Sequence, residues 1–159
     1  MRGILYVPFI ILLGLFQVSV LDICKVWNVK PDLLLVGMAA CGVYTSSAWA
    51  LSLGLLAGLW KDIFSAGPFG VNTLLFSLWS LALVKLARKI SIDNYIIFAG
   101  TIAVITALDA ILTRLVFLYF GKVVSLGIFL RILVLETAYT AAASVPLFSL
   151  AKMIHEKSR

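Results

Sequence analysis

The chain has 159 residues, of which 63% are hydrophobic and only 13% are charged. Soluble domains carry about 25% charged residues, so this composition excludes an ordinary water-soluble domain. The net charge of +6 would suggest nucleic acid as a partner for a soluble protein. In a membrane protein the same excess is typical of basic segments on the cytoplasmic side, and we therefore expect no nucleic-acid partner.

Apolar stretches follow one another along almost the whole chain and predict membrane-spanning helices. A bilayer core about 30 Å thick needs roughly 20 residues of helix, and a helix satisfies its own backbone hydrogen bonds in lipid. We expect an all-α integral membrane protein, with six transmembrane helices in a single multi-pass domain over residues 1–159. The predicted spans are 4–21, 31–44, 48–60, 71–86, 95–119 and 126–150.

The second and third spans depend on how residues 33–60 are divided. This stretch contains no charged residue and is long for one helix but short for two. The polar cluster 44–47 lies in its middle, and hydroxyl side chains of this kind favour turns and helix N-termini. The sequence therefore predicts a tight hairpin of two short helices.

The distribution of basic residues gives an orientation but leaves the number of spans open. With six spans and an inner N-terminus, seven Lys and Arg residues fall inside and four fall outside, at Lys25, Lys30, Lys61 and Lys122. Both this ratio and the eight to three of a five-span arrangement agree with the positive-inside rule. The turn at 44–47 favours six spans, which places both termini in the cytoplasm.

Four ionisable residues lie within the last two predicted spans: Asp109, Arg114, Arg131 and Glu136. Charges inside a membrane are costly, so they usually face protein or water and often mark function. In an antiparallel hairpin the two acids share one level and the two arginines another. We expect an interhelical polar network that also includes Tyr139 and Thr140. It could fix the helix register, relay protons or ions, or line a binding cavity.

Asp32 and Asp62 form a second acidic pair, near the outer ends of the second and third spans. Asp32 follows a proline, and this arrangement is typical of a helix N-terminus. Asp62 ends a helix, where an acid is unfavourable. It precedes a turn that contains Gly67 and Gly70, so it could cap this turn or contact a partner.

Small residues recur every four positions on the third span, at Ala50, Gly54 and Gly58. Such a stripe lets two helix backbones approach closely. The neighbouring helix could belong to this chain or to another protein.

Motifs for catalysis are absent from the sequence. It contains no phosphate-binding loop, no GxSxG nucleophile, no HExxH and no cluster of metal-ligating Cys and His residues. We expect a protein without enzymatic activity, with no catalytic residues, no metal and no cofactor.

Three segments resemble the bacterial rod shape-determining MreD family: PDLLLV at 31–36, GLLAGLWKDIFS at 54–65 and GPFGVN at 67–72. The resemblance covers the layout of the whole chain, but the discriminating motif covers only residues 31–72. It implies that Asp32, Asp62 and Gly70 shape the outer turn region. It also implies a fold similar to the S-components of energy-coupling-factor vitamin transporters.

The same resemblance implies a non-enzymatic subunit of the elongation machinery in the bacterial inner membrane. Such a subunit binds an MreC-type bitopic scaffold and, through it, an MreB-type filament, a RodA-type glycosyltransferase and a class B penicillin-binding protein. It helps to position peptidoglycan synthesis and so maintains cell shape. The alternative is an S-component-like transporter subunit that binds a vitamin or another small molecule near Asp109, Arg114, Arg131 and Glu136.

Overall fold

The computed structural model describes residues 2–19, 29–65, 67–89, 94–121 and 125–157, and these residues are almost entirely helical. A short 3-10 helix, η1 (Arg2–Leu5), leads into six α-helices. They are α1 (Tyr6–Ser19), α2 (Leu33–Tyr44), α3 (Ser47–Phe64), α4 (Val71–Lys89), α5 (Tyr95–Tyr119) and α6 (Leu126–Lys157). The expected all-helical fold class is confirmed.

Three of these helices are long and apolar enough to cross a membrane: Val71–Lys89, Tyr95–Tyr119 and Leu126–Glu156. Two shorter apolar helices, Tyr6–Ser19 and Leu33–Tyr44, have 14 and 12 residues. The predicted division of 33–60 is confirmed, because only Thr45 and Ser46 separate α2 from α3. The last helix runs seven residues beyond the predicted end at Leu150 and includes part of the basic tail. The predicted end of the first span, at 20–21, lies outside the described residues.

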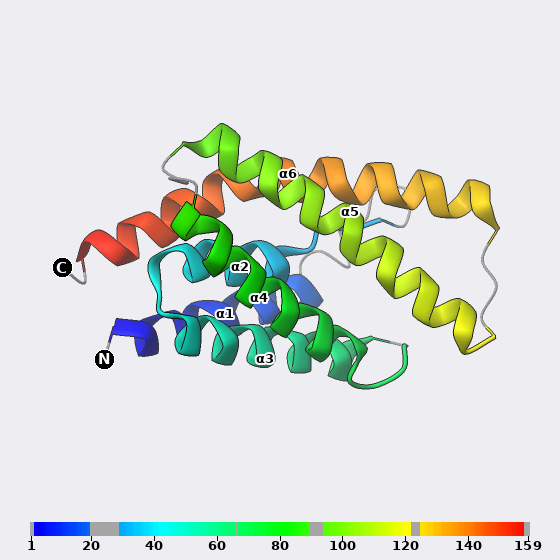
Figure 1. The fold of residues 1–159 in the computed structure, drawn as a ribbon, viewed down its shortest axis with the longest axis horizontal. Coiled ribbons are helices and arrows are strands. Elements are labelled where there is room, and N and C mark those ends of the chain that lie inside the picture. Colours follow the sequence, from blue (N-terminus) through cyan, green and yellow to red (C-terminus); the bar gives the residue numbers. More distant parts are fainter. Residues whose placement is uncertain (1, 20–28, 66, 90–93, 122–124, 158–159) are drawn as a thin grey trace.

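Successive helices run back and forth through the bundle (Figure 1). The start of η1 and the end of α6 lie at one end of the bundle, here called the termini end. The α3–α4 connection and the start of α6 lie at the opposite end, here called the turn end. At the termini end the Arg88 guanidinium donates to Ser47 Oγ at 3.0 Å, and the rings of Tyr44 and His155 stack with centroids 4.7 Å apart.

Helix α2 forms the centre of the bundle. Its first ten residues, 33–42, are all buried, and α1, α3, α4, α5 and α6 pack around it. A helix that is apolar on all sides is stable only when neighbours cover every face. With 12 residues it is about 18 Å long, which is shorter than the hydrocarbon core of a bilayer. At least one of its ends must therefore lie inside the protein or at depth in the membrane.

The outer surface of the bundle is apolar, whereas several polar side chains are inside. Leu74 is 74% exposed and Ile96 78% exposed, while Asp32, Asp62 and Asp109 are at most 5% exposed. Large apolar surfaces of this kind are rare on soluble monomers. Lipid is the solvent that such a surface requires.

The small-residue stripe of α3 lies against α4. A Cβ atom added to Gly58 would lie 2.5 Å from the Thr73 Cα, and one added to Gly54 would lie 2.7 Å from the Ser80 Oγ. Ala50 is also fully buried. The stripe is thus used for packing inside the chain, which is the first of the two roles considered for it.

Replacing Gly58 by alanine should therefore destabilise the protein. We expect a loss of about 1–3 kcal/mol, because the added methyl group meets backbone atoms that have no room to move. Thermal unfolding of the purified protein in detergent measures the effect.

Gly100→Ala is the matched control, because nothing lies within 4 Å of a Cβ at Gly100. It should leave the midpoint unchanged or raise it, since alanine is the better helix former. Equal midpoints for the two variants would contradict the close α3–α4 packing.

Candidate functional site

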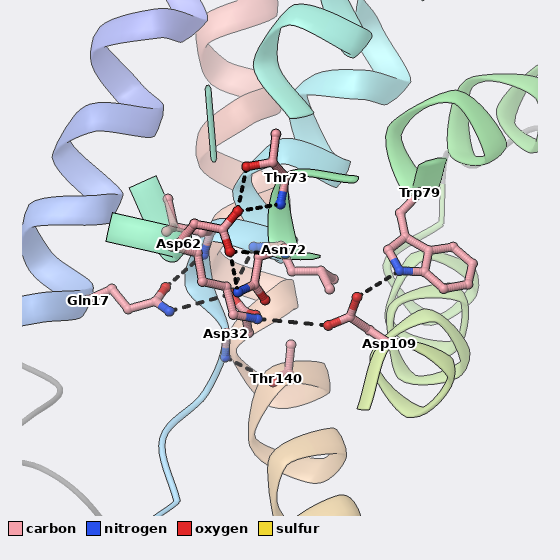
Figure 2. Close-up of polar contacts among 11 residues, drawn as sticks. Gln17, Asp32, Asp62, Asn72, Thr73, Trp79, Asp109 and Thr140 are labelled. Atoms are coloured by element: carbon pink, nitrogen blue, oxygen red, sulfur yellow. Dashed lines mark hydrogen bonds and ion pairs between the residues drawn. The ribbon is translucent and has the colours of Figure 1, made fainter. Parts of the chain in front are cut away.

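The N-terminus of α2 is buried, so its free backbone amides need partners from side chains. Asp32 is the capping residue, and its Oδ1 accepts from Leu35 N at 3.1 Å. The Gln17 Oε1 of α1 accepts from Leu34 N at 2.9 Å. The backbone N–H of Asp32 in turn donates to Thr140 Oγ1 of α6 at 3.1 Å. Figure 2 shows Gln17, Asp32 and Thr140 converging on this point from three directions. The expected position of Asp32 at a helix start is confirmed.

The Asp32 carboxylate also needs a cation, because a buried charge without a partner is costly. Lys61 of α3 supplies it through an ion pair with Asp32 Oδ2. The Lys61 ammonium also lies 3.8 Å from Asp109 Oδ2 of α5 and over the Phe76 ring of α4. The indole N–H of Trp79, also on α4, donates to Asp109 Oδ1 at 2.8 Å (Figure 2).

These contacts connect all six α-helices. We call them the central polar network, formed by Gln17, Asp32, Lys61, Trp79, Asp109 and Thr140. In this network a single ammonium group serves two buried carboxylates from different helices. Removing Lys61 would leave both carboxylates without their cation inside the bundle.

Asp62, the residue after Lys61, caps the next helix. Its oxygens accept from the backbone amides of Gly70, Asn72 and Thr73 at 3.0, 3.1 and 2.9 Å. They also accept from Asn72 Nδ2 at 2.9 Å and Thr73 Oγ1 at 2.6 Å. The carboxylate thus stabilises the N-terminus of α4, although it belongs to the C-terminus of α3. At 3% exposure Asp62 caps the turn, which is the first of the roles considered for it.

The two turn glycines have different roles in this arrangement. Gly70 has φ of +97°, a conformation that residues with a side chain rarely adopt, and this places its amide on Asp62. A Cβ at Gly67 would lie 3.0 Å from the Phe117 ring. The turn is therefore held by α3 and packed against α5.

A cavity of about 300 Å³ lies beside the network, toward the turn end. It is lined by Lys61 and Ser65 of α3, Asn72 of α4, Asp109, Ala110, Thr113, Arg114 and Phe117 of α5, and Phe129, Ile132 and Glu136 of α6. The Arg114 guanidinium lies over the Phe129 ring, 4.3 Å from its centroid. The cavity thus combines charged groups with aromatic and aliphatic walls.

The structure brings together most of the ionisable residues singled out on the last two helices. Asp109, Arg114 and Glu136 line the cavity, whereas Arg131 is exposed on α6 and is not among the lining residues. Thr140 belongs to the central polar network. Tyr139 is half-buried and makes no hydrogen bond to the described members of that network.

Sequence reasoning missed Gln17, Lys61 and Trp79. Gln17 is an uncharged polar residue within the first apolar stretch, near its C-terminal end, and this is the signal that could have revealed it. Lys61 was counted among the outer loop charges, but it belongs to α3 and contacts two carboxylates. The role of Trp79 had no sequence signal, because tryptophans are common in membrane helices.

The chemistry available at this site is that of a buried polar core. Among the described residues no three His, Cys, Asp or Glu side chains come close enough to hold a metal ion. The charged groups pair with one another across helices, and the exterior is apolar. These features define a helical membrane protein with an internal polar network.

The chain belongs to the family of rod shape-determining protein MreD, whose model matches residues 2–154. This match confirms the resemblance seen in the motif at 31–72 and extends it to nearly the whole chain. The family is one of shape-determining membrane proteins and is not known as a family of enzymes. Neither the curated proteins nor the solved structures include a match to this chain.

Replacing Asp62 by alanine should cost at least about 2 kcal/mol, because five donors lose a charged acceptor. The matched control is Asn94→Ala, which removes an exposed cap that accepts from Ile96 N at 3.2 Å. That variant should lose about 1 kcal/mol or less. Thermal unfolding in detergent compares the two, and similar losses would argue against a special role for Asp62.

Replacing Lys61 by methionine should reduce stability by about 3–5 kcal/mol, because Asp32 and Asp109 then lack their shared cation. The double variant Lys61→Met with Asp32→Asn should recover part of the loss. The exposed Lys85 provides the control, and Lys85→Met should have little effect. Membrane abundance and the unfolding midpoint are the measurements. A double variant no more stable than Lys61→Met would refute the proposed charge coupling.

Proposed function

We propose that this protein is a non-enzymatic inner-membrane subunit of the rod-shape complex. It binds an MreC-type bitopic scaffold and helps to position peptidoglycan synthesis, which maintains cell shape. The observation that carries the proposal is the family match over residues 2–154. The apolar exterior supports it, because such a surface suits contacts with lipid and with the transmembrane helices of partners.

We further propose six crossings, with both termini in the cytoplasm. Support comes from the alternating helix directions and from the position of both ends of the described chain at the termini end (Figure 1). Lys85, Arg88 and Lys89 lie in the last turns of α4, which also ends there. Lys61 pairs with buried acids and is not a free loop charge, so discounting it makes the inside bias stronger. In this arrangement the shorter helices α1 and α2 cross the membrane packed against their longer neighbours.

The proposed place of this protein in the rod-shape complex defines one direct partner and several indirect ones. The MreC-type scaffold is the direct partner, because it contributes a single membrane helix that can pack against this bundle. The MreB-type filament, the RodA-type glycosyltransferase and the class B penicillin-binding protein are reached through that scaffold. In this role the central polar network keeps the bundle rigid, so that its outer faces present fixed surfaces to partners.

Copurification tests the proposal. The full chain, tagged and expressed together with its MreC-type partner, should retain that partner in a fixed ratio in mild detergent. An unrelated single-span membrane protein, expressed at the same level, should not be retained. Absence of the partner both in mild detergent and after cross-linking in intact membranes would refute the proposal.

A further inference from the structure

The cavity beside the central polar network has a size and a lining that suit a small ligand. Its volume of about 300 Å³ is at the lower end of the range for pockets that hold small molecules. Helices α3, α4, α5 and α6 contribute to its wall, and each of them also carries a member of the central polar network. The walls are therefore held in place by the contacts that hold the bundle together.

Among the described residues, Glu136 is the acid in this region whose carboxylate accepts no hydrogen bond from the protein. Asp109 accepts from Trp79, and Asp32 and Asp62 accept from several donors. Lys61 attracts Glu136 electrostatically, but no hydrogen bond or ion pair joins the Glu136 carboxylate to another residue in the described part of the chain. A carboxylate in such surroundings is stabilised by any donor that enters the cavity.

The balance of charge at the cavity favours a positive group. Asp109 and Glu136 line the cavity, and Asp32, which is not among the lining residues, shares the ammonium of the lining residue Lys61 with Asp109. Arg114 adds a second cation, which lies over the Phe129 ring. With all groups ionised, the three acids exceed the two bases by one negative charge.

The remaining wall is suited to an apolar body. Ala110, Phe117, Phe129 and Ile132 contribute hydrocarbon surface to the cavity. Aromatic faces also attract cations, which strengthens the preference set by Glu136. A ligand with one ammonium group and a compact hydrocarbon part satisfies both halves of the lining.

We propose that this cavity binds a small organic cation, with its ammonium group at Glu136 and its apolar body against Phe117 and Ile132. The lining of the cavity comes from this chain alone, and the proposal makes no use of a scaffold-binding surface. The proposal therefore stands whether or not the chain binds an MreC-type partner.

Thiol labelling tests the charge preference of the cavity directly. Thr113 lines the cavity, so the Thr113→Cys variant places a thiol inside it. Met153 is 62% exposed near the end of α6, so Met153→Cys provides a reference thiol outside the cavity. Both are made in the full chain with Cys24 and Cys41 replaced by alanine. The probes are the cationic 2-aminoethyl and the anionic 2-sulfonatoethyl methanethiosulfonates.

In the Thr113→Cys variant the ratio of cationic to anionic labelling rates should fall at least tenfold when Glu136→Gln is added. In the Met153→Cys variant the same change should leave the ratio within twofold. Glu136→Gln should preserve the fold, because glutamine has nearly the same shape and no hydrogen bond within the described chain is lost. Unfolding midpoints of all variants check this point.

Competition tests binding itself. 2-Phenylethylammonium should slow the labelling of the Thr113→Cys variant at least tenfold, whereas the uncharged 2-phenylethanol should not. This protection should disappear with Glu136→Gln and should be absent in the Met153→Cys variant. Equal effects of the amine and the alcohol would overturn the proposal. A labelling ratio that does not depend on Glu136 would overturn it as well.

Discussion

The buried N-terminus of α2 is the constraint on which the rest of the structure depends. A central helix of 12 residues is too short to bring both of its ends to the membrane surface. Its first amides therefore require acceptors inside the bundle, and Asp32 and Gln17 provide them. The Asp32 carboxylate accepts one of these hydrogen bonds, but it also places a negative charge in the buried interior. Lys61 forms an ion pair with this carboxylate, and its second ion pair, with Asp109, connects α5 to the N-terminus of α2.

This chain of requirements explains why the interior is more polar than the exterior. In lipid, apolar contact alone gives little preference for one helix arrangement over another, because lipid tails are as apolar as leucine. Polar contacts with fixed partners supply that preference. The central polar network includes the N-cap of α2 and a residue from each of the other five α-helices, so a shift of any one helix breaks a contact at the centre. In the proposed role of presenting surfaces to partners, such a fixed arrangement would be a functional property.

Two adjacent residues, Lys61 and Asp62, carry out different tasks at the end of α3. Lys61 contacts carboxylates across the bundle, while Asp62 caps the start of α4. The close α3–α4 packing at Gly54 and Gly58 brings both residues within reach of their partners. The motif segments at 54–65 and 67–72 thus encode the end of α3, the turn after it and the start of α4, which Asp62 caps. Residues at the end of α3 and the start of α4 line the cavity, so the α3–α4 contacts help to set its position.

The sequence by itself determined the class of protein, the division of 33–60 into two helices, and the family. These features depend on local composition, on turn residues and on a motif with fixed spacing, all of which are readable along the chain. It also indicated that Asp109 and Glu136 would share a level, because helix geometry fixes the rise per residue. Only the tertiary structure decided that Lys61 faces inward and that Gln17 and Trp79 complete the network. It also decided that the small-residue stripe packs within the chain. Those outcomes depend on the rotation of each helix about its axis, which is set by the combined packing of all six helices.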